Sequence, residues 1–370
     1  IENRDSKLFI DLREVNKPQA AAGQLLVKIY AAGLNRGEFI VGAGPHGSLP
    51  YAKPMGMEAA GEIIDIGKNV TGFNLGQRVM GRCPGGFSEF GLMLALEAMP
   101  IPDSLNWTEA ASIPITFMVA YDVLIEQGEL KAGEWLMING VSSGVGTACV
   151  QLAKVLGAHT IGTSLSDKKL KLLISHGLTE SITTRSPDFY ARVLEITKEK
   201  GVNLVVNAVG GSLLAEEIRC LAYKGRLAIV GYVDGFLEAP LAIETLHSNR
   251  LKIFGVSNKN RTPEERQKSV VDFVTNFLPR FSSNDNHPLV DRIFTFDQLQ
   301  KAKELARDTI GMRNPTGQIR QSDAMEAAAL REIERIRKLG NGKLPDLMPD
   351  KLTTEQIQKA MLDEGLGSLK

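Results

Sequence analysis

The sequence predicts an α/β protein with a mostly β first part, a doubly wound parallel sheet in the middle and a helical extension at the C-terminus. In the first hundred residues, short apolar runs alternate with glycine-rich turns, and few stretches have helical spacing. Between residues 134 and 255, six short apolar runs recur, most of them separated by helical stretches. The final fifty residues have a different pattern again, with two amphipathic stretches at helical spacing.

Length and composition limit the protein class. The chain has 370 residues, too long for one core of ordinary size, so two domains are expected. Lys plus Arg and Asp plus Glu both number 43, and the zero net charge argues against a nucleic-acid partner. Three scattered cysteines form no disulfide or zinc pattern and favour a cytoplasmic location. The longest apolar stretch, 110–121, is too short for a membrane span. Because the sequence begins at Ile1 and not at Met, the removal of a leader peptide is left open.

The mostly β part has three clear strand candidates. They span residues 24–34, 62–70 and 76–82, and they are bounded by turn residues such as glycine. Because few stretches around them have helical spacing, we expect a compact β domain here.

The middle part predicts six strands, most of them separated by helices. The apolar runs are 134–139, 159–163, 180–184, 203–207, 226–231 and 251–255. After the first run, the apolar residues from Val145 to Leu156 recur at helical spacing. Strand, helix and strand at this rhythm give a parallel, doubly wound sheet, and six strands suit a dinucleotide-binding fold.

Further helices are expected after this sheet. Residues 262–265, "TPEE", combine an N-cap, a proline in the first turn and a capping box. Residues 288–308 have the pattern of a strand followed by a helix, and 317–321 that of a last strand. Two helices are then expected at 324–339 and 352–362, and the sequence leaves open whether they pack, link or bind a partner.

The stretch "NGVSSGVG", residues 139–146, joins the first strand of the middle part to its helix. Its glycines let the backbone turn sharply and approach a bulky ligand. The helix that begins near Val145 directs unpaired N–H groups and the positive end of its dipole at the loop, which suits a pyrophosphate. Ser142 and Ser143 add hydroxyl donors. An ordinary glycine-rich turn is the alternative, but the six-strand context favours nucleotide binding.

The end of the second strand indicates which dinucleotide binds. Enzymes that use NAD usually carry an acid there for the ribose hydroxyls. Here the strand ends in Thr163 and Ser164 without an acid, and Lys169 follows. A hydroxyl and an ammonium group suit a 2′-phosphate, and Arg185 after the third strand adds a cation, although a surface lysine is often only solvated. The sequence therefore favours NADPH over NADH.

Seven segments occur in an order that is typical of one family. They are "AAGLNRGEF" (31–39), "MGMEAAGEIIDIGKNV" (55–70), "GGFSEF" (85–90), "LNWTEAASIPITFMVAYDVL" (105–124), "NGVSSGVGTACVQLAK" (139–154), "NAVGG" (207–211) and "HPLVDRIFTFDQLQKA" (287–302). Together they resemble the zinc-independent quinone oxidoreductase (zeta-crystallin-like) branch of the medium-chain dehydrogenase/reductase superfamily, over about residues 5–320.

The resemblance implies a domain organisation. A GroES-like catalytic domain would comprise residues 1–110 and 258–320, and a Rossmann NADP-binding domain would comprise 111–257. The cofactor would lie between them, and residues 321–370 would form the helical extension. The resemblance further implies a homodimer or tetramer.

The resemblance also bears on metals. Zinc-dependent members of the superfamily have a Cys where this chain has Asn35 and a His where it has Met57. Neither side chain suits Zn²⁺, and Glu58 alone does not make a site. The four-cysteine lobe of those members is missing as well, so we expect no metal.

Matched motif by motif, the resemblance implies a set of dinucleotide contacts. They are Thr116, Gly140, Ser142, Gly144, Val145, Gly146, Ser164, Lys169, Val209 and Gly210. The hydroxyl of Ser143 in the loop and the cation of Arg185 after the third strand join this set.

Three residues are candidates for catalysis. Asn35 stands where the family has an asparagine near the nicotinamide, and its amide could polarise a substrate oxygen or merely hold a turn. His46 aligns with a position that is often aromatic in the family, and a solvated loop residue is the alternative. Tyr51, five residues on, could line the cleft or donate a proton.

Taken together, these features predict an NADPH-dependent reductase of a quinone or of the activated C=C bond of an α,β-unsaturated carbonyl compound. One alternative is an enoyl-thioester (enoyl-CoA or enoyl-ACP) reductase. Such an enzyme would need basic residues at the entrance of its site to bind the phosphate of the carrier, and the neutral net charge of the chain gives no sign of them. The other is a non-catalytic NADPH-binding protein with a structural or regulatory role.

Overall fold

The computed structural model describes residues 2–4, 7–9, 12–35, 38, 54–184, 187–258, 260–282, 287–302 and 304. In that part of the chain no helix is long and apolar enough to cross a membrane. The contacts divide the chain into two units, residues 1–310 and 311–370. The second unit lies outside the described residues, so the helical extension at 321–370 stays a prediction, as do the domain limits.

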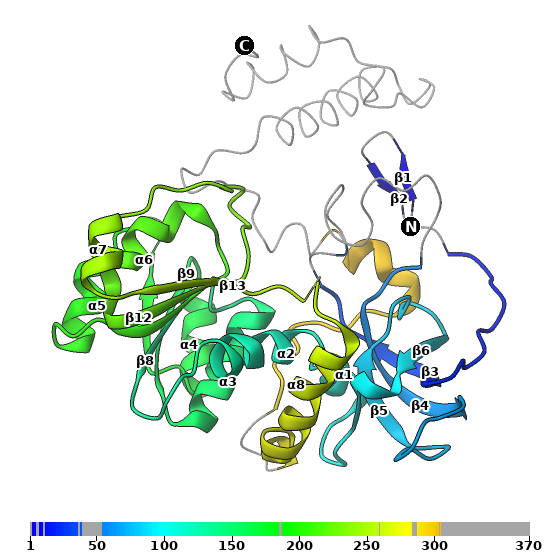
Figure 1. The fold of residues 1–370 in the computed structure, drawn as a ribbon. Coiled ribbons are helices and arrows are strands. Elements are labelled where there is room, and N and C mark those ends of the chain that lie inside the picture. Colours follow the sequence, from blue (N-terminus) through cyan, green and yellow to red (C-terminus); the bar gives the residue numbers. More distant parts are fainter. Residues whose placement is uncertain are drawn as a thin grey trace, which may run out of the picture. The chain divides into compact units, whose positions relative to one another are not determined.

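The first sheet is antiparallel and belongs to the N-terminal part of the chain (Figure 1). Its strands, in the order in which they pair, are β6 (Phe90–Leu94), β3 (Gln24–Ala32), β4 (Glu58–Ile66), β5 (Arg78–Arg82) and β7 (Ala98–Pro100). The three predicted strands are β3, β4 and β5, and β4 begins earlier than expected, at Glu58. Leu25, Val27, Ile63 and Met93 fill its core, which confirms a β domain in this part.

The second sheet is parallel. Its strands, in the order in which they pair, are β10 (Glu180–Thr183), β9 (His159–Ser164), β8 (Trp135–Asn139), β11 (Val202–Asn207), β12 (Leu221–Ile229) and β13 (Lys252–Gly255). All six predicted strands are present, which confirms the doubly wound class. Because β8 pairs with β9 on one side and β11 on the other, the carboxyl ends of these three strands meet at one edge, where such folds bind ligands.

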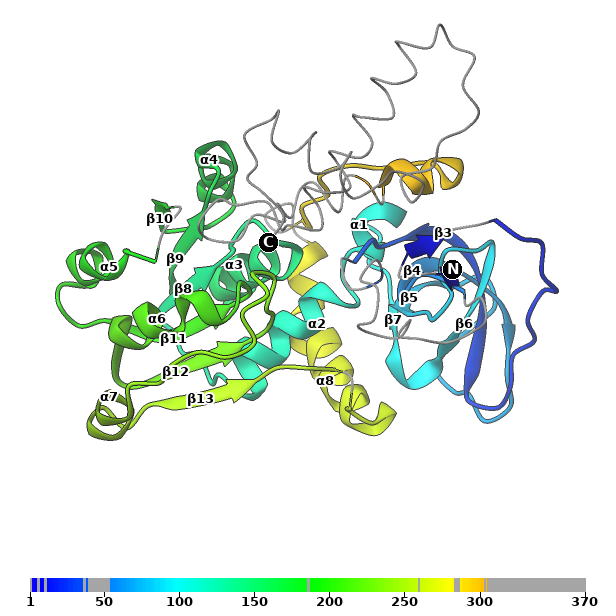
Figure 2. The same cartoon turned by 90° about the horizontal axis from the view of Figure 1, so that it is seen from above.

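Helices cover both faces of the parallel sheet. Those that follow its strands are α3 (Gly144–Leu156), α4 (Asp167–Ser175), α5 (Tyr190–Thr197), α6 (Leu214–Cys220) and α7 (Ile243–Ser248). On β8, Leu136 and Ile138 bury in one core and Met137 in another, since alternate residues of a strand face opposite sides. Figure 2 shows α3 and α5 on opposite sides of the sheet. Burial on both faces explains why these strands are continuous apolar runs.

A third group of helices follows the last strand of each sheet along the chain. It comprises α1 (Trp107–Ala111), α2 (Thr116–Tyr121), the π-helical turn η4 (Asp122–Glu126), α8 (Pro263–Asn276) and the 3₁₀ turn η6 (Leu278–Ser282). Five aromatic rings from these helices pack against one another, with ring centroids 5.1 to 6.4 Å apart in the pairs that touch: Phe117, Tyr121, Phe273, Phe277 and Phe281. These large apolar rings hold α2, α8 and η6 together.

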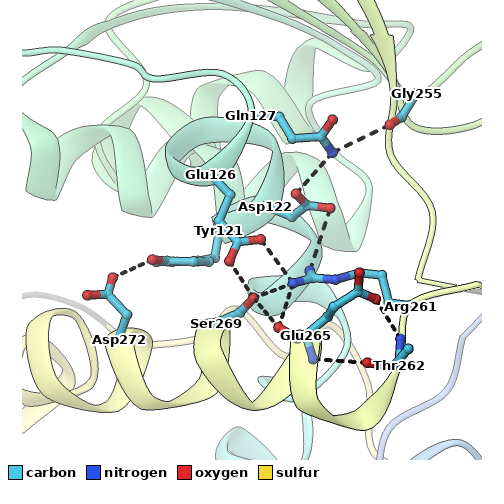
Figure 3. Close-up of polar contacts among 10 residues, drawn as sticks. All are labelled: Tyr121, Asp122, Glu126, Gln127, Gly255, Arg261, Thr262, Glu265, Ser269 and Asp272. Carbon is cyan, nitrogen blue, oxygen red and sulfur yellow. Dashed lines mark hydrogen bonds and ion pairs between the residues drawn. The ribbon is translucent and has the colours of Figure 1, made fainter.

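Polar contacts fix the start of α8. The predicted capping box is present: Thr262 Oγ1 accepts the N–H of Glu265 at 3.2 Å, and Glu265 Oε2 accepts the N–H of Thr262 at 2.7 Å. Arg261 lies 3.1 Å from a carboxylate oxygen of Glu126 and 3.8 Å from one of Asp122 (Figure 3). Both acids belong to η4, so these ion pairs bind the start of α8 to that turn.

The region after α8 differs from expectation. Residues 288–294 pair with no strand within the described ranges, and the expected last strand, 317–321, lies outside them. A strand exists only where the backbone finds a partner, so the apolar pattern alone was insufficient. The helix expected next begins with the 3₁₀ turn η7 (Phe296–Gln298). At the other end of the chain, β1 (Glu2–Arg4) and β2 (Lys7–Phe9) form a separate antiparallel pair.

Candidate functional site

The glycine-rich loop lies at the carboxyl end of β8. Gly140 turns the chain with a φ of 79°, in the left-handed region. Ser143 is the N-cap of α3, and its Oγ accepts the N–H of Gly146 at 3.1 Å. A Cβ on Gly146 would lie 2.6 Å from the carbonyl oxygen of Val141, so the first helical turn packs directly on the loop. The N-terminus of a 13-residue helix therefore faces a loop whose glycines leave the backbone uncovered by side chains. This arrangement suits the binding of an anion.

Residues from two other elements lie against this loop. A Cβ on Gly144 would lie 2.9 Å from Thr116 Cγ2, so the start of α2 contacts the loop. A Cβ on Gly140 would lie 3.5 Å from Val209 Cγ2, so the turn after β11 borders it as well. The fold thus brings together residues that are distant in sequence and that were predicted to contact one ligand.

The end of β9 carries hydroxyl groups and no acid. Ser164 Oγ lies 3.2 Å from Ser142 Oγ and accepts the N–H of Ser166 at 3.3 Å. Ser166 in turn caps α4, since its Oγ accepts the N–H of Lys169 at 3.4 Å. Lys169 is half-buried, and Arg185 lies outside the described residues. Two hydroxyls and a nearby lysine therefore occupy the place where NAD enzymes hold a carboxylate.

The turn after β11 is held by its own side chain. Asn207 Oδ1 accepts the N–H groups of Val209 and Gly210, each at 2.8 Å. Gly210 has a φ of 134°, and a Cβ there would overlap Asp234. The predicted contacts that surround this edge of the sheet are Thr116, Gly140, Ser142, Ser143, Gly144, Val145, Gly146, Ser164, Val209 and Gly210, with Lys169 at the start of α4. Their contact with a cofactor stays a prediction.

A cluster of one half-buried amide and two buried carboxylates forms beside β4. Asn35 Nδ2 donates to Glu58 Oε1 at 2.7 Å and lies 3.5 Å from Glu38 Oε1. Glu58 Oε2 accepts the N–H of Ile115 at 2.7 Å. Ile115 directly precedes Thr116, which contacts the glycine-rich loop. Glu58 therefore links this cluster to the edge that carries the predicted cofactor contacts.

The two carboxylates of the cluster hold protons unusually well. Burial raises the pKa of Glu58 to about 7, against the hydrogen bonds from Asn35 and Ile115. Burial and the nearby charge of Glu58 raise the pKa of Glu38 to about 8. Glu38 Oε2 is buried and has no hydrogen-bond partner among the described residues. The pair therefore retains a proton near neutral pH.

The other predicted residues give a mixed picture. His46 and Tyr51 lie outside the described residues, so their roles stay predictions. Within the described ranges, no group of three or more His, Cys, Asp or Glu side chains is arranged to hold a metal ion. Cys83, Cys149 and Cys220 are buried thiols, and burial raises the pKa of Cys83 to about 12. These cysteines therefore do not serve as thiolates near neutral pH.

Sequence reasoning missed four polar residues of this region. Asn139 and Asn207 end β8 and β11, a position that presents side chains at the ligand edge and could have identified them. Glu38 follows Asn35 at the spacing of one turn, which was a weaker signal. Glu217 of α6 gave no signal, because nothing local separates a buried acid on a helix from an exposed one.

Two family models match the chain. The model of the alcohol dehydrogenase GroES-like domain matches residues 21–103, which contain the antiparallel sheet. The model of the zinc-binding dehydrogenase domain matches residues 144–276, which contain β9 to β13 and α8. The two domains thus follow one another in the order that the motifs predicted.

Individual proteins are similar as well. One of the phenolphthiocerol/phthiocerol polyketide synthase proteins of Mycobacterium tuberculosis is 34% identical over 238 residues, which are 64% of this chain and 11% of that protein. The chain spans about a tenth of the length of the polyketide synthases that it matches. Quinone oxidoreductase of Mus musculus is 28% identical over 264 residues, 69% of this chain and 78% of that protein. The structure of Escherichia coli quinone oxidoreductase complexed with NADPH has a TM-score of 0.67 at 24% identity, covering 81% of this chain and 92% of that one.

These matches agree with the features of the chain itself. The strand order of the parallel sheet and the glycine-rich loop at β8 are those of a dinucleotide-binding domain. The resemblance places Asn35 and Met57 at the positions where zinc-dependent members have Cys and His. The chain therefore contains an alcohol dehydrogenase GroES-like domain followed by a zinc-binding dehydrogenase domain, and it is similar to quinone oxidoreductases.

Proposed function

We propose that the protein is an NADPH-dependent, zinc-independent reductase of a quinone or of the activated C=C bond of an α,β-unsaturated carbonyl compound. The observation that carries this proposal is the double contact of Glu58, which accepts hydrogen bonds from Asn35 and from the N–H of Ile115. These contacts join a cluster that retains a proton to the edge that suits a dinucleotide. A reaction that adds a hydride and a proton needs these two features side by side.

The cofactor half of the proposal is supported by the chemistry of the loop and of its neighbours. The bare backbone and the N-terminus of α3 suit a pyrophosphate. The hydroxyls of Ser142 and Ser164, with Lys169 nearby, suit a 2′-phosphate, which an acid would repel. Arg185 is proposed as a second cation for the same group. When bound, NADPH supplies the hydride.

The substrate half assigns two tasks to the buried cluster. Glu58 holds one N–H of Asn35 at 2.7 Å, whereas the contact of that nitrogen with Glu38 at 3.5 Å is at the limit for a hydrogen bond. The second N–H of Asn35 is therefore available to a carbonyl or quinone oxygen. With NADPH as the source of the hydride, Glu38 or Glu58 would supply the proton that the reduced product needs. His46 and Tyr51 are the other proposed proton donors.

Further parts of the proposal rest on the resemblance to quinone oxidoreductases and on composition. We expect a homodimer or tetramer in the cytosol, with a small-molecule substrate and neither nucleic acid nor membrane as a partner. Three buried thiols agree with a reducing compartment, where they would stay unpaired. Size-exclusion chromatography with light scattering measures the oligomer directly.

The function is tested by NADPH oxidation with a panel of quinones, enones and enoyl thioesters. Turnover with quinones or enones is expected. Turnover with enoyl thioesters alone would identify an enoyl-thioester reductase instead. Nucleotide binding without turnover of any compound would leave a non-catalytic NADPH-binding protein.

The cofactor preference is tested by Ser164→Asp. The new carboxylate would repel the 2′-phosphate and accept hydrogen bonds from ribose hydroxyls, so the ratio of kcat/KM for NADPH to that for NADH should fall at least about tenfold. Ser175→Asp, which adds the same charge at the far end of α4, is the matched control. An unchanged ratio in Ser164→Asp would show that the 2′-phosphate lies elsewhere.

A further inference from the structure

Glu217 of α6 is a fully buried acid beneath the glycine-rich loop. Its side chain is 0% exposed, and burial raises its pKa to about 8, with a smaller contribution from the charge of Asp234. Glu217 Oε1 accepts the side-chain N–H of Asn139 at 2.6 Å, and Oε2 accepts that of Asn207 at 2.7 Å. Both partners are neutral amides. A buried acid without a charged partner is costly, and an apolar residue would pack there more cheaply.

Each of these two amides also accepts hydrogen bonds from a neighbouring element through its oxygen. Asn139 Oδ1 accepts the hydroxyl of Thr163 at 2.6 Å, which ties the end of β8 to the end of β9. Asn207 Oδ1 accepts the N–H groups of Val209 and Gly210, which shapes the turn after β11. Glu217 therefore stands at the centre of a network that reaches three strand ends.

The side chain of Glu217 helps to orient both amides. Its two oxygens accept hydrogen bonds from the nitrogens of Asn139 and Asn207, so these nitrogens point inward and the amide oxygens outward. The carbonyl of Gly210 accepts from the same nitrogen of Asn207 at 2.9 Å and acts in the same direction. The outward oxygen of Asn207 is the one that the turn requires, because the backbone groups of Val209 and Gly210 that face it are donors. A reversed amide would set N–H against N–H and release the turn. Val209 borders Gly140, so a released turn would change the wall of the loop.

We propose that Glu217 is a positioning residue for the cofactor. It fixes the amides of Asn139 and Asn207, and through them the turn after β8 and the turn after β11, against which the dinucleotide lies. The inference rests on the proposed binding of NADPH at this edge. It adds a residue that does not touch the cofactor and that neither the motifs nor the resemblance indicated.

The test measures the Kd for NADPH by fluorescence titration, with circular dichroism to verify folding, in the full chain. Glu217→Met removes both acceptors at similar volume, and the Kd should rise about ten- to a hundredfold. Glu217→Gln should stay within about threefold of the wild type, because the Asn139 amide and the Thr163 hydroxyl can both reverse to satisfy it. Glu216→Met is the matched control on the same helix: Glu216 contacts Arg219 and the N–H of Tyr190, not the strand ends.

A second pair of variants serves if Glu217→Met does not fold. Asn139→Asp alone places two carboxylates together and should weaken NADPH binding. The double variant Asn139→Asp/Glu217→Gln restores every hydrogen bond and only moves the charge from α6 to β8, so it should bind NADPH like the wild type. A double variant no better than Asn139→Asp would overturn the inference.

The outcomes separate this inference from the proposed function. A folded Glu217→Met that binds NADPH like the wild type overturns the inference alone. Wild-type binding of NADPH without turnover of any substrate overturns the proposed reaction and leaves the inference standing on the variant Kd values. A wild-type protein that binds neither NADPH nor NADH overturns both.

Discussion

The molecule buries acids in two different ways. Glu97, in the 3₁₀ turn η3 (Ala95–Glu97), is 4% exposed and meets the guanidinium of Arg266 at 2.8 Å and that of Arg82 at 3.6 Å. Glu58, 1% exposed, meets only the amide of Asn35 and the N–H of Ile115 among the described residues. The first acid is compensated by charge and the second by neutral donors.

The two kinds of buried acid suit different roles, one structural and one in proton transfer. A carboxylate between guanidinium groups forms ion pairs that bind elements together, here α8 to the antiparallel sheet. A carboxylate among neutral donors keeps a pKa near neutrality, so it can exchange a proton at the working pH. The second arrangement occurs twice at the proposed cofactor edge, in Glu58 and in Glu217. Three substitutions test whether this division holds.

The largest expected effect is on stability, in Arg266→Met. The substitution leaves Glu97 buried with only the more distant Arg82, so the free energy of unfolding should fall by about 3 kcal/mol. Urea denaturation measures it. Lys171→Met, which breaks the exposed pair with Asp167 on α4, should change the free energy of unfolding by less than about 1 kcal/mol. Equal losses in the two variants would contradict the division.

What the sequence could predict here depended on local signals. The strand from Trp135 to Asn139 was recognisable because burial on both faces leaves a continuous apolar run. The start of α8 was recognisable because its capping box lies within four residues. The glycine-rich loop combined both kinds of signal, and half of the proposed dinucleotide contacts lie in it.

The buried acids could not be predicted in the same way. Glu217 meets Asn139 across 78 residues of chain, and Arg266 meets Glu97 across 169. No local pattern shows that such an acid is buried, because burial and pairing are set by the packing of distant elements. The strand expected in the first part of 288–308 is absent from the described residues, and a strand likewise depends on a distant partner.

An intermediate effect is expected on turnover, in Glu58→Gln. The new side chain must keep its oxygen toward the N–H of Ile115, so its amide nitrogen meets Nδ2 of Asn35 and turns that amide around. The value of kcat should fall about ten- to a hundredfold, whereas the Kd for NADPH should not change. Steady-state kinetics and titration separate the two. In Glu62→Gln, the matched control four residues on in β4, kcat should stay at the wild-type value. An unaltered kcat in Glu58→Gln would remove this acid from the reaction.

The smallest expected effect is the pH dependence of stability in Glu217→Gln. Because burial raises the folded-state pKa from 4.5 to about 8, this carboxyl group favours the folded state fully below about pH 4.5, and its contribution is lost as the pH rises toward about 8. The glutamine does not titrate, so the unfolding free energy of the variant should gain on that of the wild type by at most about 1.4 kcal/mol per pH unit. Urea denaturation from about pH 6 to about pH 8 measures this gain. Parallel curves would mean that Glu217 titrates normally in the folded protein, and burial among neutral donors would then not set this acid apart.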